Sequence, residues 1–166
     1  MRLRSRECAE LKRYPAGSTF AHASRWSQRL FVPNGELEAG VQDLASKLPR
    51  PFLGVHVRRG DKAVEGAVHV ENEHVAATLE AAAREFGCTH VALLSDDPAA
   101  AAAIQQHSRT VTITAVDRMI PTSAFGLLSA VLALARHATA LLGHSTSNMF
   151  RWMLQMSYQA TYSNLG

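Results

Sequence analysis

A short apolar run in the first half of the chain leads into a dense group of polar and charged residues. The run, residues 52–57, predicts a buried strand that ends before Gly60. The polar residues at its end and directly after it are His56, Arg58, Arg59, Asp61 and Lys62. In an open parallel sheet, ligands bind beyond the carboxyl ends of the strands, where guanidiniums can offer forked donors to phosphate oxygens. The pattern therefore predicts a phosphate site, and the alternative is that the adjacent arginines form an ordinary solvated surface.

A pair of carboxylates follows a second apolar run, residues 90–95. Asp96 and Asp97 would lie at the same edge of a parallel sheet as the arginines, and there they could bind a metal ion, a sugar hydroxyl or the arginines themselves. The alternative is that Asp97 caps the helix that Pro98 begins. We expect both roles to hold, with Asp96 facing the site.

A polar turn, residues 145–148, follows a further apolar run and opens the last expected helix. Its members include Thr146, Ser147 and Asn148. Hydroxyls and free backbone N–H groups at a helix N-terminus bind anions, although ordinary helix capping is equally consistent with these residue types. Their expected position at the same sheet edge as the arginines favours shared phosphate binding.

Helices and strands are expected to alternate along the rest of the chain. The expected helices are residues 36–48, 74–86, 99–106, 124–136 and 149–158, and the expected strands are 52–57, 90–95, 110–113 and 138–142. This order predicts an α/β fold, a Rossmann-like parallel sheet with helices on both faces. With 166 residues, of which 47% are hydrophobic, the chain can form one domain with a core of its own.

The N-terminal segment differs from the rest in charge. Residues 1–30 hold seven Arg or Lys and two Glu, whereas the whole chain has a net charge of only +3. We therefore divide the chain into a basic, irregular arm or domain remnant at residues 1–29 and a Rossmann-like domain at residues 30–166. The arm lacks a lysine-rich run or interleaved aromatic residues, so no nucleic-acid partner is expected.

Several common classes of protein do not fit the sequence. Two cysteines, Cys8 and Cys88, make neither a disulfide framework nor a zinc motif, and the histidines lack metal-ligand spacing, so no metal or cofactor is expected. The chain has no GxGxxG, P-loop or GxSxG motif. No apolar signal segment follows Met1, and Arg136 interrupts the apolar residues 124–143, so no signal or transmembrane segment is expected.

Residues 56–62, HVRRGDK, resemble the HxRR(T/G)DK signature of the α1,6-fucosyltransferases, glycosyltransferase family 23. Three further segments follow that family's order: the helix at residues 30–48, an ATDDP-like segment at 94–98, and an FSSxxxR-like segment at 145–151. The resemblance covers about residues 26–166. The α1,2-fucosyltransferases share HxRRGD and SDD, but their final motif has a tryptophan pair that this chain lacks, and protein O-fucosyltransferases are more distant.

The resemblance implies the C-terminal, donor-binding half of a two-domain GT-B glycosyltransferase. That enzyme would transfer fucose from GDP-fucose, with inversion and without a metal, to a glycan hydroxyl such as the core GlcNAc of an N-glycan. Its implied location is the Golgi lumen or membrane. The implied catalytic residues are Glu65 as general base and Lys62 as its assistant. The implied donor-binding residues are His56, Arg58, Arg59, Asp61, Asp96, Asp97, Thr146, Ser147 and Asn148.

Three features of the chain depart from the family pattern. Glu65 follows Lys62 by three residues where the family usually has four, and residues 129–131 lack the aspartate that reads guanine. The chain also has little sequence before Leu30, so we expect a partial chain whose N-terminal half would be a partner. The alternative is a degenerate, non-catalytic domain that binds a nucleotide or a phosphoglycan.

Overall fold

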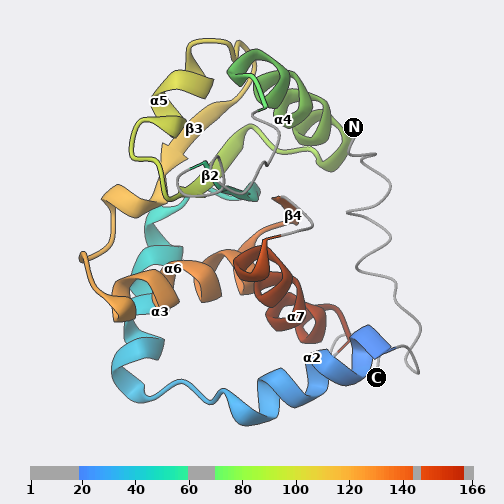
Figure 1. Cartoon of the computed structure of the whole chain (residues 1–166), viewed down its shortest axis with the longest axis vertical. Helices are drawn as coiled ribbons and strands as arrows, with labels where there is room; N and C mark the ends of the chain where they lie inside the picture. Colours follow the sequence, from blue (N-terminus) through green and yellow to red (C-terminus); the bar gives the residue numbers. More distant parts are fainter. Residues whose placement is uncertain (1–18, 60–69, 144–146, 163–166) are drawn as a thin grey trace.

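The structure, a computed structural model, describes residues 19–59, 70–143 and 147–162. Within these ranges the chain forms one four-stranded sheet in the order β3-β2-β1-β4, and every neighbouring pair is parallel (Figure 1). Its strands are β1 Phe52–Val57, β2 His90–Ser95, β3 Thr112–Ala115 and β4 Ala140–Gly143. Val57 pairs with Ser95 and His56 with Gly143, so the carboxyl ends of β1, β2 and β4 meet at one edge.

Helices cover both faces of this sheet, as expected (Figure 1). They are α2 Thr19–Leu30, α3 Gly35–Lys47, α4 Asn72–Phe86, α5 Ala100–Gln105, the 3-10 turn η2 Val116–Arg118, α6 Ala124–His137 and α7 Asn148–Tyr162. Phe52 of β1 packs in the core formed with α3, α6 and α7, whereas Leu53 and Val55 pack in the core formed with α4 and α5. This alternation follows the two-residue period of a strand and places His56 on the face of α6 and α7.

The α/β fold with a parallel sheet is confirmed, and the expected bounds of β1 and β2 match those observed. β3 and β4 begin two residues later than expected, at Thr112 and Ala140. In both cases the start of the strand is set by its partner, since Thr112 aligns with His90 and Ala140 with Leu53. Pairing with a neighbouring strand therefore outweighs local β propensity at these ends.

Helix α2 occupies part of the segment that was expected to be irregular, and it packs along α7. Ser24 is fully buried and its hydroxyl donates to the carbonyl of Gln155. Ser27 Oγ donates to Gln155 Oε1 at 2.9 Å, and Gln28 Nε2 donates to the Gln155 carbonyl at 2.8 Å. These described contacts run through polar side chains, which contribute no apolar periodicity to the sequence. The division of the chain at residue 30 stays a prediction.

None of the described helices combines the length and the hydropathy that crossing a bilayer requires.

The turn before β3 is held to α4 by the carboxylate of Glu80. This carboxylate accepts hydrogen bonds from the backbone N–H of Arg109 at 2.5 Å, from that of Thr110 at 2.9 Å, and from Ser108 Oγ at 3.1 Å. The backbone donors, Arg109 first, lower the pKa of Glu80 from 4.5 to about 2. Hydrogen bonds to the charged form favour ionisation, so the folded state prefers the carboxylate more strongly than the unfolded chain does.

We expect Glu80→Gln to lower the melting temperature at pH 7 and to matter progressively less in acid. The folded pKa lies below the unfolded one, so the stabilisation is complete above about pH 4.5 and is lost as the pH falls towards 2. Thermal unfolding of both proteins at pH 7, 4 and 3 measures this gap. Glu85→Gln, at an exposed position of the same helix, is the control. A gap that stays constant down to pH 3 would contradict the prediction.

Candidate functional site

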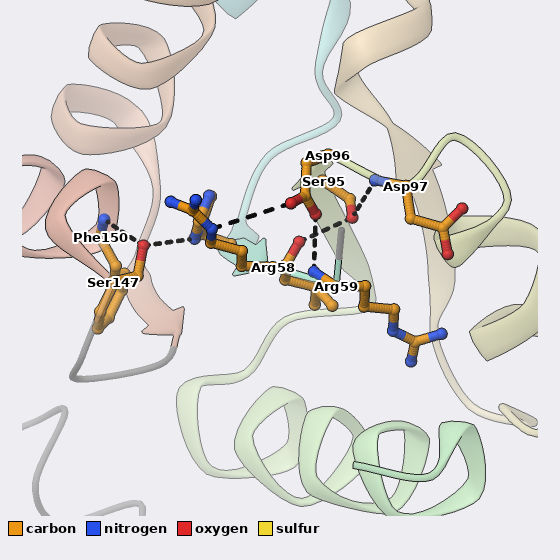
Figure 2. Close-up of polar contacts among 9 residues, drawn as sticks. Arg58, Arg59, Ser95, Asp96, Asp97, Ser147 and Phe150 are labelled. Atoms are coloured by element: carbon orange, nitrogen blue, oxygen red, sulfur yellow. Dashed lines mark hydrogen bonds and ion pairs between the residues drawn. The ribbon is translucent and has the colours of Figure 1, made fainter. Parts of the chain in front are cut away.

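The carboxyl ends of β1 and β2 are joined by side-chain hydrogen bonds just where their ladder stops (Figure 2). Ser95 Oγ donates to the carbonyl of Val57 at 2.7 Å and accepts from the backbone N–H of Asp97 at 3.1 Å. Asp96 Oδ1 accepts from the backbone N–H of Arg59 at 2.7 Å. The first turn after β2 is therefore fastened to the residues that leave β1.

The two arginines leave this junction in different directions. Arg58 extends on the side of Ser147 and α7, whereas Arg59 extends to the opposite side (Figure 2). This continues the alternation of β1, in which successive side chains point to opposite faces. Arg58 Nε lies 3.9 Å from Asp96 Oδ2, and the two side chains are 30% and 37% exposed. The guanidiniums of Arg58 and Arg59 thus do not lie side by side, and their expected joint grip on a diphosphate stays a prediction.

Ser147 connects β1 to the start of α7. Its carbonyl accepts from the backbone N–H of Arg151 at 3.0 Å, and its hydroxyl accepts from that of Phe150 at 3.4 Å. The same hydroxyl lies 3.4 Å from Nδ1 of His56, and both side chains are buried. Ser147 therefore caps α7, and the N-terminus of that helix lies at the sheet edge next to β1.

His56 is a neutral hydrogen-bonding group in this environment. Burial is the main cause that lowers its pKa; Asp96 raises it and Arg58 lowers it further. A neutral imidazole has one ring nitrogen that donates and one that accepts, so Nδ1 can accept from the hydroxyl of Ser147. The lowered pKa favours the neutral imidazole, so Arg58 rather than His56 supplies positive charge on the side of Ser147.

The two aspartates serve different neighbours. The carboxylate of Asp97 accepts from the backbone N–H of Ala99 at 2.9 Å and so holds the turn that leads into α5. Asp96 faces Arg58 and the backbone of Arg59. The sequence predicts that Asp97 caps the helix after Pro98, but α5 begins at Ala100 with Ala99 as its N-cap residue, so Asp97 holds the preceding turn instead. The role of Asp96 at a phosphate site stays a prediction.

Four of the predicted site residues, Asp61, Lys62, Glu65 and Thr146, lie outside the described residues. Asn148 is exposed at the first position of α7. The sequence interpretation passed over Ser95, although it ends a strand directly before Asp96 and Asp97. A serine hydroxyl commonly accepts from the N–H two residues further on, which is a signal that could have identified it.

The sequence matches no model of a known protein family and no curated protein. Among solved structures, the chain is similar to that of POFUT1 in complex with GDP, with a TM-score of 0.59 and 14% sequence identity. The match covers 82% of this chain and 47% of the POFUT1 chain, so this chain spans about half of that protein's length. At this identity the likeness shows the fold alone and does not single out glycosyltransferase family 23.

Proposed function

We propose that this chain is the donor-binding part of a fucosyltransferase-like enzyme and that it binds the GDP moiety of GDP-fucose at the edge formed by β1, β2 and β4. The observation that carries the proposal is the position of Arg58, which leaves β1 on the same side as Ser147 and the N-terminus of α7. A guanidinium and a helix N-terminus both favour anions, and together they suit a diphosphate. The likeness in fold to a protein solved with GDP supports the same ligand.

The proposed reaction moves a fucosyl group, with inversion, from GDP-fucose to a hydroxyl of a glycan, and GDP leaves. Arg58 stabilises the negative charge that develops on the departing diphosphate, a task that some enzymes give to a metal ion. A base takes the proton of the acceptor hydroxyl. We assign that role to Glu65, assisted by Lys62, from the family resemblance alone. The N-glycan core GlcNAc as acceptor and the Golgi as location rest on the same resemblance.

We further propose that a second half supplies the acceptor surface and the closure of the site. The basis is the match to only 47% of the POFUT1 chain. To position two substrates and to exclude water, an enzyme must enclose the reacting groups with protein on both sides. On this proposal, the 166-residue chain binds GDP and transfers little fucose by itself.

Calorimetric titration of the purified chain with GDP, GDP-fucose, UDP and a single-stranded oligonucleotide tests the binding step. We expect GDP and GDP-fucose to bind with similar affinity, because the diphosphate carries most of the proposed contacts. Binding of the oligonucleotide alone would reject the proposal.

The catalytic assignment needs a protein that carries both halves. There, Glu65→Gln should slow fucosyl transfer and leave GDP affinity unchanged, because the amide keeps the shape of the side chain but cannot take a proton. Normal turnover would reject Glu65 as the base, and a loss of GDP affinity would make it part of the binding site instead. If neither the variant nor the unaltered two-half protein transfers fucose, the degenerate binding domain is the better description.

A further inference from the structure

Both peptide groups that flank Arg58 are held by the two residues at the end of β2. The Val57 carbonyl, on the N-terminal side, accepts from Ser95 Oγ at 2.7 Å. The Arg59 N–H, on the C-terminal side, donates to Asp96 Oδ1 at 2.7 Å. We call this arrangement of Ser95 and Asp96 around Arg58 the β2 clamp (Figure 2).

The β2 clamp holds the backbone just beyond the last residue pair of the sheet. The parallel ladder between β1 and β2 ends at the pair Val57 and Ser95, so Arg58 is the first residue beyond that ladder. Each residue has two soft backbone dihedrals, and fixing the peptide planes on both sides of a residue fixes both of them. The direction of the Cα–Cβ bond of Arg58 is then set by the end of β2.

The β2 clamp is also hydrogen-bonded to the turn that follows β2. Ser95 Oγ also accepts from the backbone N–H of Asp97 at 3.1 Å, and the Asp97 carboxylate accepts from the N–H of Ala99 at 2.9 Å. The hydroxyl of Ser95 thus makes two hydrogen bonds, one to the end of β1 and one to the turn after β2. It thereby links the backbone next to Arg58 to the turn before α5. An alanine at position 95 would lose both bonds at once.

The β2 clamp also explains why a carboxylate occupies a site proposed for a diphosphate. Close to a bound anion, Asp96 would repel it by like charge. Its Oδ1 is engaged by the backbone of Arg59, and its Oδ2 lies 3.9 Å from Arg58 Nε. The carboxylate of Asp96 therefore faces Arg58 and the backbone of Arg59, and its negative charge stabilises the guanidinium of Arg58.

We propose that Ser95 is a positioning residue for the phosphate grip. Together with Asp96 it fixes the direction in which Arg58 leaves the sheet, so that affinity for a diphosphate depends on a hydroxyl directed at the protein backbone. An arginine held in its binding direction loses less conformational freedom when the ligand arrives, and the bound state is favoured accordingly. This inference rests on the proposed function, since it assumes that Arg58 binds the diphosphate of GDP.

The test is a GDP titration of the full chain with three substitutions at position 95. Loss of one or two neutral hydrogen bonds from the clamp predicts that Ser95→Ala weakens GDP binding by about 3- to 30-fold. Ser95→Thr keeps the hydroxyl and should restore most of the affinity. Ser95→Cys keeps the side-chain volume with a weaker donor, should also lose affinity, and serves if the alanine variant does not fold.

A matched control separates positioning from general destabilisation. Ser129 is buried in α6 and its hydroxyl donates to the Phe125 carbonyl at 2.9 Å. Ser129→Ala also removes a hydrogen bond of a buried serine hydroxyl to a backbone carbonyl, and it should leave GDP affinity unchanged. In the Arg58→Lys background the effect of Ser95→Ala on GDP affinity should shrink, because the forked side chain that the clamp directs is gone.

The outcomes distinguish this inference from the function on which it rests. If the unaltered chain does not bind GDP, the proposed function falls and the inference with it. If the unaltered chain binds GDP and folded Ser95→Ala binds it equally well, only the positioning role is overturned. An effect of Ser95→Ala that is as large in the Arg58→Lys variant as in the unaltered chain would likewise overturn it, since the hydroxyl would then act independently of Arg58.

Discussion

Lysine in place of Arg58 should weaken GDP binding by about tenfold to a hundredfold, although the positive charge is kept. One or more charge-assisted hydrogen bonds of about 1.5–3 kcal/mol would be lost, because an ammonium cannot reproduce the planar fork of a guanidinium. The backbone around Arg58 is held at the end of β2, so a shorter reach is not recovered by movement of the chain. Isothermal titration of Arg58→Lys with GDP measures the loss.

The same change at Arg59 should have a smaller effect. Its side chain extends away from Ser147 and α7, on the other side of the strand end (Figure 2). Arg84→Lys, at an exposed position in the last turn of α4, is the control and should leave GDP affinity unchanged. Equal losses of GDP affinity in the Arg58 and Arg59 variants would indicate that both arginines bind the diphosphate, as the sequence motif implies. Unchanged affinity in both would place the arginines on an ordinary solvated surface.

The fold could be predicted from the sequence wherever an element carries its own pattern. The apolar runs of β1 and β2 are bounded by turn-forming residues, and both strands lie where the sequence places them. The starts of β3 and β4 depend on their partners in the sheet, so the local sequence placed them two residues too early. Helix α2 was not predicted: its described contacts with α7 run through polar side chains such as Ser24 and Gln28, which give no periodic apolar signal.

The candidate site, too, could be predicted only in part from the sequence. The sequence motif brings the right residue types to the end of β1, and the parallel topology brings Asp96 and Ser147 beside them. The opposite directions of Arg58 and Arg59 follow from the two-residue period of β1. The bonds from Ser95 and Asp96 to the backbone on either side of Arg58 could not be predicted, because these residues are distant from Arg58 in sequence.

The second large effect is expected from a substitution at Gly143, where β4 closely contacts Phe150 of α7. Gly143 ends β4 beside His56, and a Cβ atom at this position would lie 2.4 Å from Cδ2 of Phe150. Phe150 is 2% exposed and lies in the first turn of α7, so its ring has no room to withdraw into solvent. A side chain at position 143 must therefore push the start of α7 away from the sheet edge, and Ser147 with it.

We expect Gly143→Ala to destabilise the fold by about 1–3 kcal/mol, the usual cost of overpacking a core. It should also weaken GDP binding, because the displaced helix N-terminus no longer faces the end of β1. Denaturant unfolding and GDP titration measure the two effects. Gly35→Ala is the control, since no atom lies within 4 Å of a Cβ at that position, and it should be neutral or slightly stabilising.

A second change at Phe150 separates the contact from other consequences of the added methyl group. Phe150→Leu alone should destabilise the protein by removing buried ring atoms. Combined with Gly143→Ala, it should cost less than the two changes separately, because the smaller side chain makes room for the Cβ atom. The double variant should also recover part of the GDP affinity, since α7 can return to the sheet edge. Strict additivity in both measurements would show that position 143 acts on the site by some route other than Phe150.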